Sequence, residues 1–169
     1  MDRQYNEQQK IAIDIARKCF LRDDNLYGCA ESAYIALKTV FDLPNSQVSS
    51  SAIALNGGIA YSGAVCGAIT GAALAIGELA EYRIENHKAA KQSAREIVRQ
   101  LIIDFQNEFS SSECAKLIPY QLSIPLEHKK FIVSGIWRTV CMKQIEFAVA
   151  QTVELVERHL MSKPTNTHL

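Results

Sequence analysis

The sequence predicts an all-α protein, a single-domain helical bundle of about five to seven helices. In several segments apolar residues recur at four-residue steps, which places them on one face of an α-helix. Proline, glycine and asparagine separate these segments and interrupt helices. No segment shows the apolar–polar alternation of a half-buried β-strand, and no glycine-rich phosphate loop follows a strand-like run.

The first helix is expected over residues 5–22, where Ile11, Ile15 and Cys19 are spaced four residues apart. This spacing predicts that the three side chains form the inner face of the helix, with Cys19 filling space in the core. The polar stretch "DDNLYG" then ends the helix.

Two further helices precede the glycine-rich middle of the chain. One is expected over 29–43, with Ala33 and Leu37 inward, and Pro44 ends it. A short helix is expected over 49–55, capped by a serine and stopped by "NGG", whose residues tolerate positive φ.

The next helix is expected over 63–82, and it carries Gly63, Gly67 and Gly71 on one face because they repeat every four residues. A glycine inside a helix costs about 1 kcal/mol relative to alanine. Three on one face therefore indicate that something packs closely against it. The sequence leaves open whether this is another helix, a partner subunit or a cofactor.

The second half of the chain contains two long amphipathic helices. One is expected over 85–109, with Ile97, Leu101 and Phe105 inward, and the last over 141–160. Between them, "SSSECAKLI" is typical of a short serine-capped helix and "PYQLSIP" of a loop.

The composition is that of an ordinary globular domain. Of the 169 residues, 48% are hydrophobic, which suffices for a core and is too many for a disordered chain. We therefore expect one helical domain over residues 1–160 and a disordered tail over 161–169. Lys and Arg total 18, as do Asp and Glu. Since no basic stripe suits a phosphate backbone, nucleic acid is not an expected partner.

The N-terminal segment "MDRQYNEQQKIAIDIARKCF" has charges throughout and does not read as a signal peptide. We expect a location in the reducing cytoplasm, where cysteines serve as ligands or redox groups more often than in structural disulfides. The uncharged stretch between Asp42 and Glu78 is interrupted by Pro44, Asn45 and several glycines. No membrane span is therefore expected.

Four of the five cysteines share a local setting. Each lies at or near the expected start of a helix, after a loop or a breaker: Cys29, Cys66, Cys114 and Cys141. A helix start carries partial positive charge and free N–H groups. We therefore expect the thiolate, the form that binds metals and attacks disulfides, to be favoured there. No C-x-x-C pair occurs, so each ligand would come from a different helical segment.

The surroundings of these cysteines also give the chain a resemblance. Four motifs carry it, each with one cysteine: "GCAESAY" (Cys29), "CGAITG" (Cys66), "ECAKLI" (Cys114) and "CMKQIEFAV" (Cys141). With a glycine pair at 57–58, the chain resembles, over residues 16–156, the redox-active family named for its C…GCAxxG…C…C pattern. It departs from that family at Gly28, where asparagine is usual, and in a longer segment between the last two cysteines.

The resemblance implies redox or metal chemistry at these four thiols, since related domains in some electron-transfer proteins are associated with an iron–sulfur centre. We expect the four cysteines to ligate an iron–sulfur cluster or another metal, for electron transfer or redox sensing. The activity would be that of an oxidoreductase or an electron-transfer component. Gly67 and Ala68 would leave room for inorganic sulfide and offer backbone N–H donors.

Three alternatives to a cluster stay open. Two of the thiols could cycle between dithiol and disulfide without a metal, zinc could occupy a four-cysteine site, or the protein could be a non-catalytic helical interaction protein with structural cysteines. The redox partner protein is unknown, and the glycine face makes a homodimer a further expectation.

Histidine-dependent catalysis is not expected. His87, His128 and His159 lie in charged segments that we expect to be exposed to solvent. Trp137 is the single tryptophan, and we expect it in the core or at an interface.

Overall fold

The structure is a computed structural model that describes residues 4–161. In this part of the chain there are seven α-helices: α1 (Glu7–Phe20), α2 (Cys29–Val40), α3 (Gly67–Arg83), α4 (His87–Phe109), α5 (Cys114–Leu117), α6 (Pro125–Ser134) and α7 (Val140–Val156). Two 3₁₀-helices and a terminal π-helix accompany them: η1 (Ser50–Leu55), η2 (Ile136–Arg138) and η3 (Glu157–Met161). The predicted all-α class is confirmed.

Two further expectations concern the chain end and the membrane. The disordered tail expected at 161–169 lies, apart from Met161, outside the described residues. Met161 itself is the last residue of the π-helix. Among the described helices, none combines the length and the hydrophobicity that a membrane span requires.

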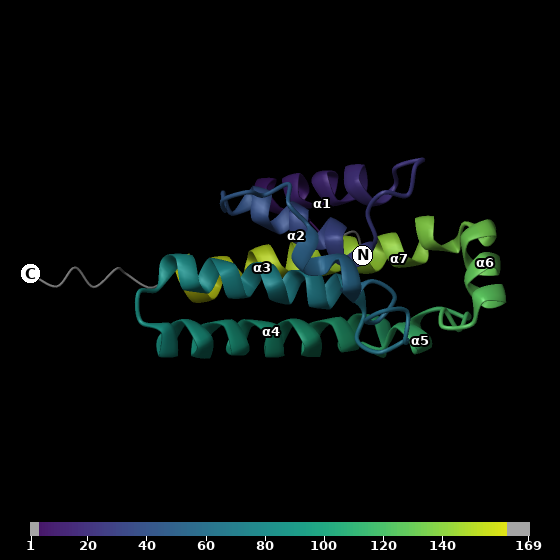
Figure 1. The fold of residues 1–169 in the computed structure, drawn as a ribbon. Coiled ribbons are helices and arrows are strands. Elements are labelled where there is room, and N and C mark those ends of the chain that lie inside the picture. Colours follow the sequence, from purple (N-terminus) through teal and green to yellow (C-terminus); the bar gives the residue numbers. More distant parts are fainter. Residues whose placement is uncertain (1–3, 162–169) are drawn as a thin grey trace, which may run out of the picture.

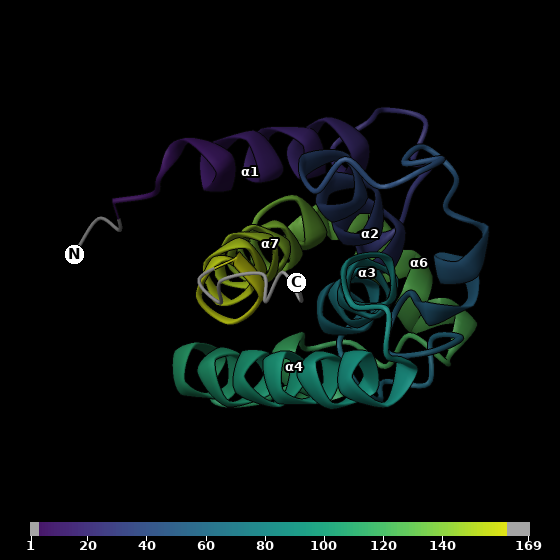
Figure 2. The same cartoon turned by 90° about the vertical axis from the view of Figure 1, so that its left-hand side faces the viewer.

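The helices form three layers. α1 and α2 lie on one side, α3 and α7 in the middle and α4 on the other side (Figure 1 and Figure 2). α3 packs against α2 and α4, and α7 packs against α1, α2, α3 and α4. α6 crosses one end of the bundle, and α2, α3 and α7 begin towards that end, where α5 also lies (Figure 1). The first residues of four helices are thereby brought together.

The core follows the predicted inner faces of the two long helices. Ile97, Leu101 and Phe105 of α4 are fully buried, as predicted. The ring of Phe105 lies 5.8 Å from that of Phe147 on α7, in an edge-to-face arrangement. Such aromatic pairs contribute about 0.5–1.5 kcal/mol beyond the burial of their area, so α4 and α7 are held by specific contacts.

The predicted inner face of α1 is wrong by one residue. Ile11 is exposed, while Ile15 and Cys19 are only half-buried. The buried positions are instead Gln9, Ala12, Ala16 and Phe20. Because α1 packs against both α2 and α7, its small alanines allow close approach and the larger isoleucines lie at the flanks. Cys19 consequently does not fill the core.

The glycine face of α3 packs against another helix of the same chain. Gly63 lies before α3 with φ +81°, so the helix begins at Gly67, later than predicted. A Cβ added to Gly71 would lie 2.1 Å from the carbonyl oxygen of Ala30 in α2. One added to Gly67 would lie 2.3 Å from Sγ of Cys29. This face is therefore covered by α2 and is not free for a second subunit.

α6 is the helix that sequence reasoning missed. Pro125 occupies its first position, and Gly135, with φ +68°, ends it. Within the helix only Phe131 is buried, so no repeated apolar face indicates it in the sequence. α6 matters here because it lies across the end of the bundle where α2, α3 and α7 begin (Figure 1).

Candidate functional site

The prediction that four cysteines stand at helix starts is confirmed. They occupy the first residue of α2 (Cys29), the N-cap of α3 (Cys66), the first residue of α5 (Cys114) and the second residue of α7 (Cys141). All five cysteines of the chain are free. The four thiols thus come from four helical segments that are distant in the sequence.

An isolated antiparallel bridge between Val65 and Glu113 joins the starts of α3 and α5. The backbone N–H groups of Cys66 and Cys114 donate across this bridge to carbonyl oxygens 2.8 and 2.7 Å away. Side chains alternate between the two faces of such a pair. Because each cysteine follows a bridging residue, both thiols extend from the same face.

The sulfur of Cys29 fits where Gly67 has no side chain. It donates to Oδ1 of Asn56 at 3.8 Å, a weak contact of a thiol proton. Several backbone N–H groups also act on this sulfur: those of Gly57, Ala30, Cys29 and Gly67. Two helix starts and one loop therefore contribute donors around a single thiol.

Asn56 caps α2 from a loop 26 residues further along the chain. Its Oδ1 accepts from the N–H of Ala30 at 2.9 Å, and its Nδ2 donates to Glu31 at 3.0 Å. The side chain of Asn56 also explains why this chain has Gly28 where asparagine is usual. A Cβ on Gly28 would lie 2.3 Å from the side chain of Asn56, so the loop asparagine occupies the space that a capping residue at 28 would need.

We expect Asn56→Ala to lower the free energy of unfolding by about 1–2 kcal/mol, because α2 loses its cap and Glu31 loses a donor. Urea unfolding measures this. Asn86→Ala is the matched control, since Asn86 caps α4 through the N–H of Ala89 at 3.0 Å, far from Cys29. Both variants should be destabilised, but only Asn56→Ala should change the alkylation rate of the site thiols. Wild-type stability of Asn56→Ala would contradict this role of the loop.

Burial dominates the electrostatics of the site. It raises the pKa of Cys66 well above the ordinary 9.0 and the pKa of Cys114 to about 12. Burial also raises the pKa values of Cys29 and Cys141. Backbone N–H groups lower the pKa of Cys29 and of Cys66, but burial outweighs them. The expectation that helix starts favour the thiolates is therefore wrong for this site.

The thiols also act on one another. After burial, a charge on Cys29 is the main cause that raises the pKa values of Cys66, Cys114 and Cys141. Such coulombic effects weaken with distance, so the sulfur of Cys29 lies within electrostatic range of the other three thiols. For Cys19 the causes are its own burial and Arg22, which leaves this fifth cysteine apart.

The buried thiols predict an alkaline loss of stability. In the unfolded chain a cysteine ionises near its ordinary pKa of 9.0, whereas Cys66 and Cys114 stay protonated in the fold to higher pH. Their stabilisation is therefore fully present below pH 9 and is lost as the pH rises towards 12. Above pH 9, each of these two thiols should lower the free energy of unfolding by about 1.4 kcal/mol per pH unit.

Urea unfolding under reducing conditions between pH 8 and pH 10 measures this slope. The double variant Cys66→Ala/Cys114→Ala should have a clearly shallower pH dependence than the wild type. If the two slopes agreed, the buried thiols would not be its source.

A cavity of about 340 Å³ opens beside the thiols, and Cys29, Cys114 and Cys141 line it. Most of its other walls are apolar or aromatic. Trp137 is among them, and it is buried against the ring of Phe20 in an edge-to-face pair 5.4 Å apart. The expectation that Trp137 lies in the core is confirmed.

His128 is a site residue that sequence reasoning missed. It is half-buried in α6 and lines the cavity, with its ring 4.6 Å from that of Tyr61. The expectation that it is exposed to solvent is wrong because α6 was not predicted. His128 and Phe131, three residues apart, lie on the same side of that helix, and this spacing was the available signal.

The loop before α3 contains a left-handed turn. Residues 57–61 all have φ between +50° and +75°, and three of them, Ile59, Ala60 and Tyr61, are not glycine. The left-handed conformation costs such residues about 1–2 kcal/mol each, and strain of this kind clusters at functional sites. Here the turn directs the N–H of Gly57 towards Cys29 and brings Tyr61 to the cavity.

The donor set fits a thiophilic centre, since four cysteines are the common ligands of iron–sulfur clusters. Gly67 and Ala68 supply backbone N–H groups that stabilise the charged sulfurs of Cys29 and Cys66. Their role towards a cofactor stays a prediction. Within residues 4–161, no three His, Cys, Asp or Glu side chains are already grouped around a position for one metal ion.

The fold and the site define an all-helical protein with four cysteines at helix starts, three of which line one cavity. The family model described as "Putative redox-active protein (C_GCAxxG_C_C)" matches residues 27–155, and the chain belongs to this family. All four cysteines of the site lie within the matched region. No curated protein and no solved structure matched the chain.

Proposed function

We propose that this protein is a redox protein whose four gathered cysteines hold an iron–sulfur cluster, for electron transfer or redox sensing. The observation that carries the proposal is that thiols from the starts of α2, α5 and α7 line one cavity, while the buried thiol of Cys66 at the start of α3 lies within electrostatic range of them. When bound, such a cluster supplies one-electron chemistry, with a potential tuned by burial and by hydrogen bonds to sulfur.

The thiols keep their protons until a metal binds to the sulfurs. Because burial raises the pKa values of Cys66 and Cys114, both are protonated at neutral pH, and ligation must release these protons. Iron binding should therefore strengthen as the pH rises. Protonated thiols are also weak nucleophiles, which favours a metal centre over a metal-free dithiol cycle.

The backbone around the sulfurs supports the same function. N–H groups of Gly57, Ala30 and Gly67 act on Cys29, and that of Ala68 acts on Cys66. These groups stabilise negative charge on the sulfur ligands, which is how a protein tunes the potential of a cluster. Cys66 and Cys114 are both nearly fully buried. They would keep water from the inner side of the cluster.

Anaerobic reconstitution with ferrous iron and sulfide tests the proposal. We expect a brown protein with bound iron and acid-labile sulfide, and alkylation that reaches only Cys19 while the cluster is present. A colourless protein without iron after reconstitution would refute the cluster. If mild oxidant then removed two titratable thiols, the metal-free dithiol cycle would replace the cluster as the proposed function.

A further inference from the structure

We propose that the cavity beside the thiols binds a planar ring compound that carries carbonyl oxygens, of the quinone class. Its volume of about 340 Å³ lies within the range of small-molecule sites. The binding of a flat ring is inferred from the cavity alone. The choice of a quinone rests on the proposed redox function, because Cys29, Cys114 and Cys141 line the same cavity.

Aromatic side chains form much of the wall. Phe20, Phe131 and Trp137 are all buried and all line the cavity. Phe131 also packs against the ring of Tyr120, at 5.8 Å, so its orientation is fixed. Planar rings bind well against such fixed aromatic surfaces, by stacking or by edge-to-face contact.

His128 offers the polar contact. Its ring lines the cavity, and no residue in the described range 4–161 forms a hydrogen bond with its ring nitrogens. An imidazole N–H can donate to a carbonyl oxygen. Two other polar side chains of the wall, Glu31 and Asn56, are engaged with each other, and Glu31 also accepts from Gly28 and Ser49. A few donors on a mainly apolar wall suit a ring with few oxygens.

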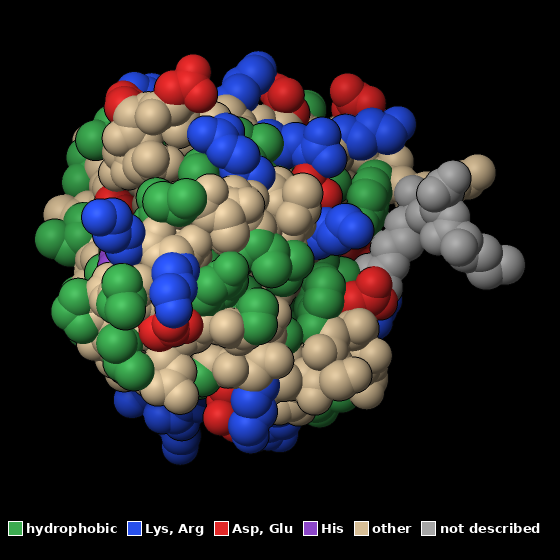
Figure 3. Space-filling view, turned by 90° about the vertical axis from the view of Figure 1, so that its right-hand side faces the viewer, with side chains coloured by type: hydrophobic (Ala, Val, Ile, Leu, Met, Phe, Trp, Pro, Cys, Tyr) green, Lys and Arg blue, Asp and Glu red, His purple; other side chains and the backbone are tan. Residues whose placement is uncertain are grey.

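The mouth of the cavity is apolar as well. Leu26, Ile53, Tyr61 and Ile132 line it and are exposed to solvent, each by more than two fifths of its surface. Figure 3 looks onto this end of the molecule and shows hydrophobic side chains over its centre, with most charged side chains towards the rim. An apolar ligand can therefore approach the thiols from this end.

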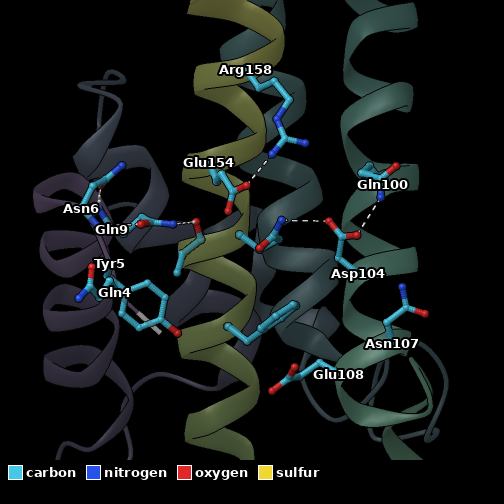
Figure 4. A pocket seen from close by; sticks show the side chains of 13 residues that line it. Gln4, Tyr5, Asn6, Gln9, Gln100, Asp104, Asn107, Glu108, Glu154 and Arg158 are labelled. Carbon is cyan, nitrogen blue, oxygen red and sulfur yellow. Dashed lines mark hydrogen bonds and ion pairs between the residues drawn. The ribbon is translucent and has the colours of Figure 1, made fainter. Parts of the chain in front are cut away.

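A second, larger hollow lacks these features. The trough of about 810 Å³ between α1, α4 and α7 is lined mainly by amides and carboxylates (Figure 4). Its polar groups bind one another: Asp104 accepts from Gln100 at 2.8 Å and from Gln151 at 2.9 Å. No cysteine lines this trough, so the cavity at the thiols carries the inference.

The probe for the experiment is 2,3-dimethyl-1,4-naphthoquinone, whose methyl groups block addition of thiols to the ring. Trp137 is the only tryptophan and lines the cavity, so its fluorescence reports binding there. We expect a saturable change in fluorescence, with the same affinity by calorimetry. Both are measured with and without iron, so absence of a cluster and absence of binding are separate results.

Two neighbouring residues of α6 provide matched variants. Ile132 lines the cavity, whereas Val133 is 79% exposed and does not. Ile132→Glu should weaken binding about tenfold, since it places a charge against an apolar ligand, and Val133→Glu should leave the affinity unchanged. His128→Leu should weaken binding about fivefold through loss of one hydrogen bond, and it serves if Ile132→Glu fails to fold.

Three results would overturn the inference. They are a fluorescence change that does not saturate, equal affinities of Ile132→Glu and Val133→Glu, and wild-type affinity of folded His128→Leu. The first means that no site exists, and the other two mean that the ligand lies elsewhere on the apolar end.

Discussion

Replacing Cys29 with serine is expected to abolish iron and sulfide binding, with at least a roughly tenfold loss of iron per chain after reconstitution. Cys29 is the thiol whose charge acts on the other three. Its sulfur also lies against Gly67, Asn56 and several backbone N–H groups. A serine oxygen is a harder donor than sulfur and a poor ligand for such a cluster.

The chain provides its own control for this variant. Cys19 lies half-buried on α1, outside the cavity, and its pKa is unaffected by the other cysteines. Cys19→Ser should therefore bind iron as the wild type does. Iron, sulfide and visible absorption are measured on both variants under identical anaerobic conditions. Wild-type iron content in Cys29→Ser would remove Cys29 from the ligand set.

Gly71→Ala is expected to destabilise the protein by about 3 kcal/mol, whereas Gly77→Ala on the same helix should stabilise it by about 1 kcal/mol. At Gly71 the added Cβ would lie 2.1 Å from the carbonyl oxygen of Ala30 and 2.9 Å from its carbonyl carbon. These are backbone atoms of α2, so relief requires the two helices to separate. At Gly77 no atom lies within 4 Å of the added group.

Urea unfolding of both variants gives the two free energies. In the Gly71 variant α2 must move, and Cys29 moves with it, so iron binding should also fall. In the Gly77 variant iron binding should equal that of the wild type. A stability order opposite to the predicted one would show that the contact between α2 and α3 is looser than described.

Much of the fold follows from spacing in the sequence. The inner residues of α4 and the helix starts at the four cysteines were predictable, because a strong apolar period and clear breakers define them. The face of α1 was not, since its inner side is built from alanines rather than from the more hydrophobic Ile11 and Ile15. Close approach of α2 and α7 decided that face, and it is a tertiary property.

The site was predictable in its cysteines and not in its surroundings. Tyr61 reaches it through a left-handed turn that directly follows Asn56 and includes Ile59, a β-branched residue seldom found at positive φ. His128 reaches it on α6, which has one buried residue and thus no periodic signal. The raised pKa values were missed for a related reason, because burial is fixed only when the four helix starts meet.

The central claim, that four thiols from four helix starts hold one iron–sulfur cluster, is tested most directly by iron K-edge X-ray absorption on the reconstituted protein. We predict a first shell of sulfur alone with a second iron nearby, and loss of both in Cys66→Ser. Iron with nitrogen or oxygen neighbours, or a sulfur shell that persists in Cys66→Ser, would contradict the claim.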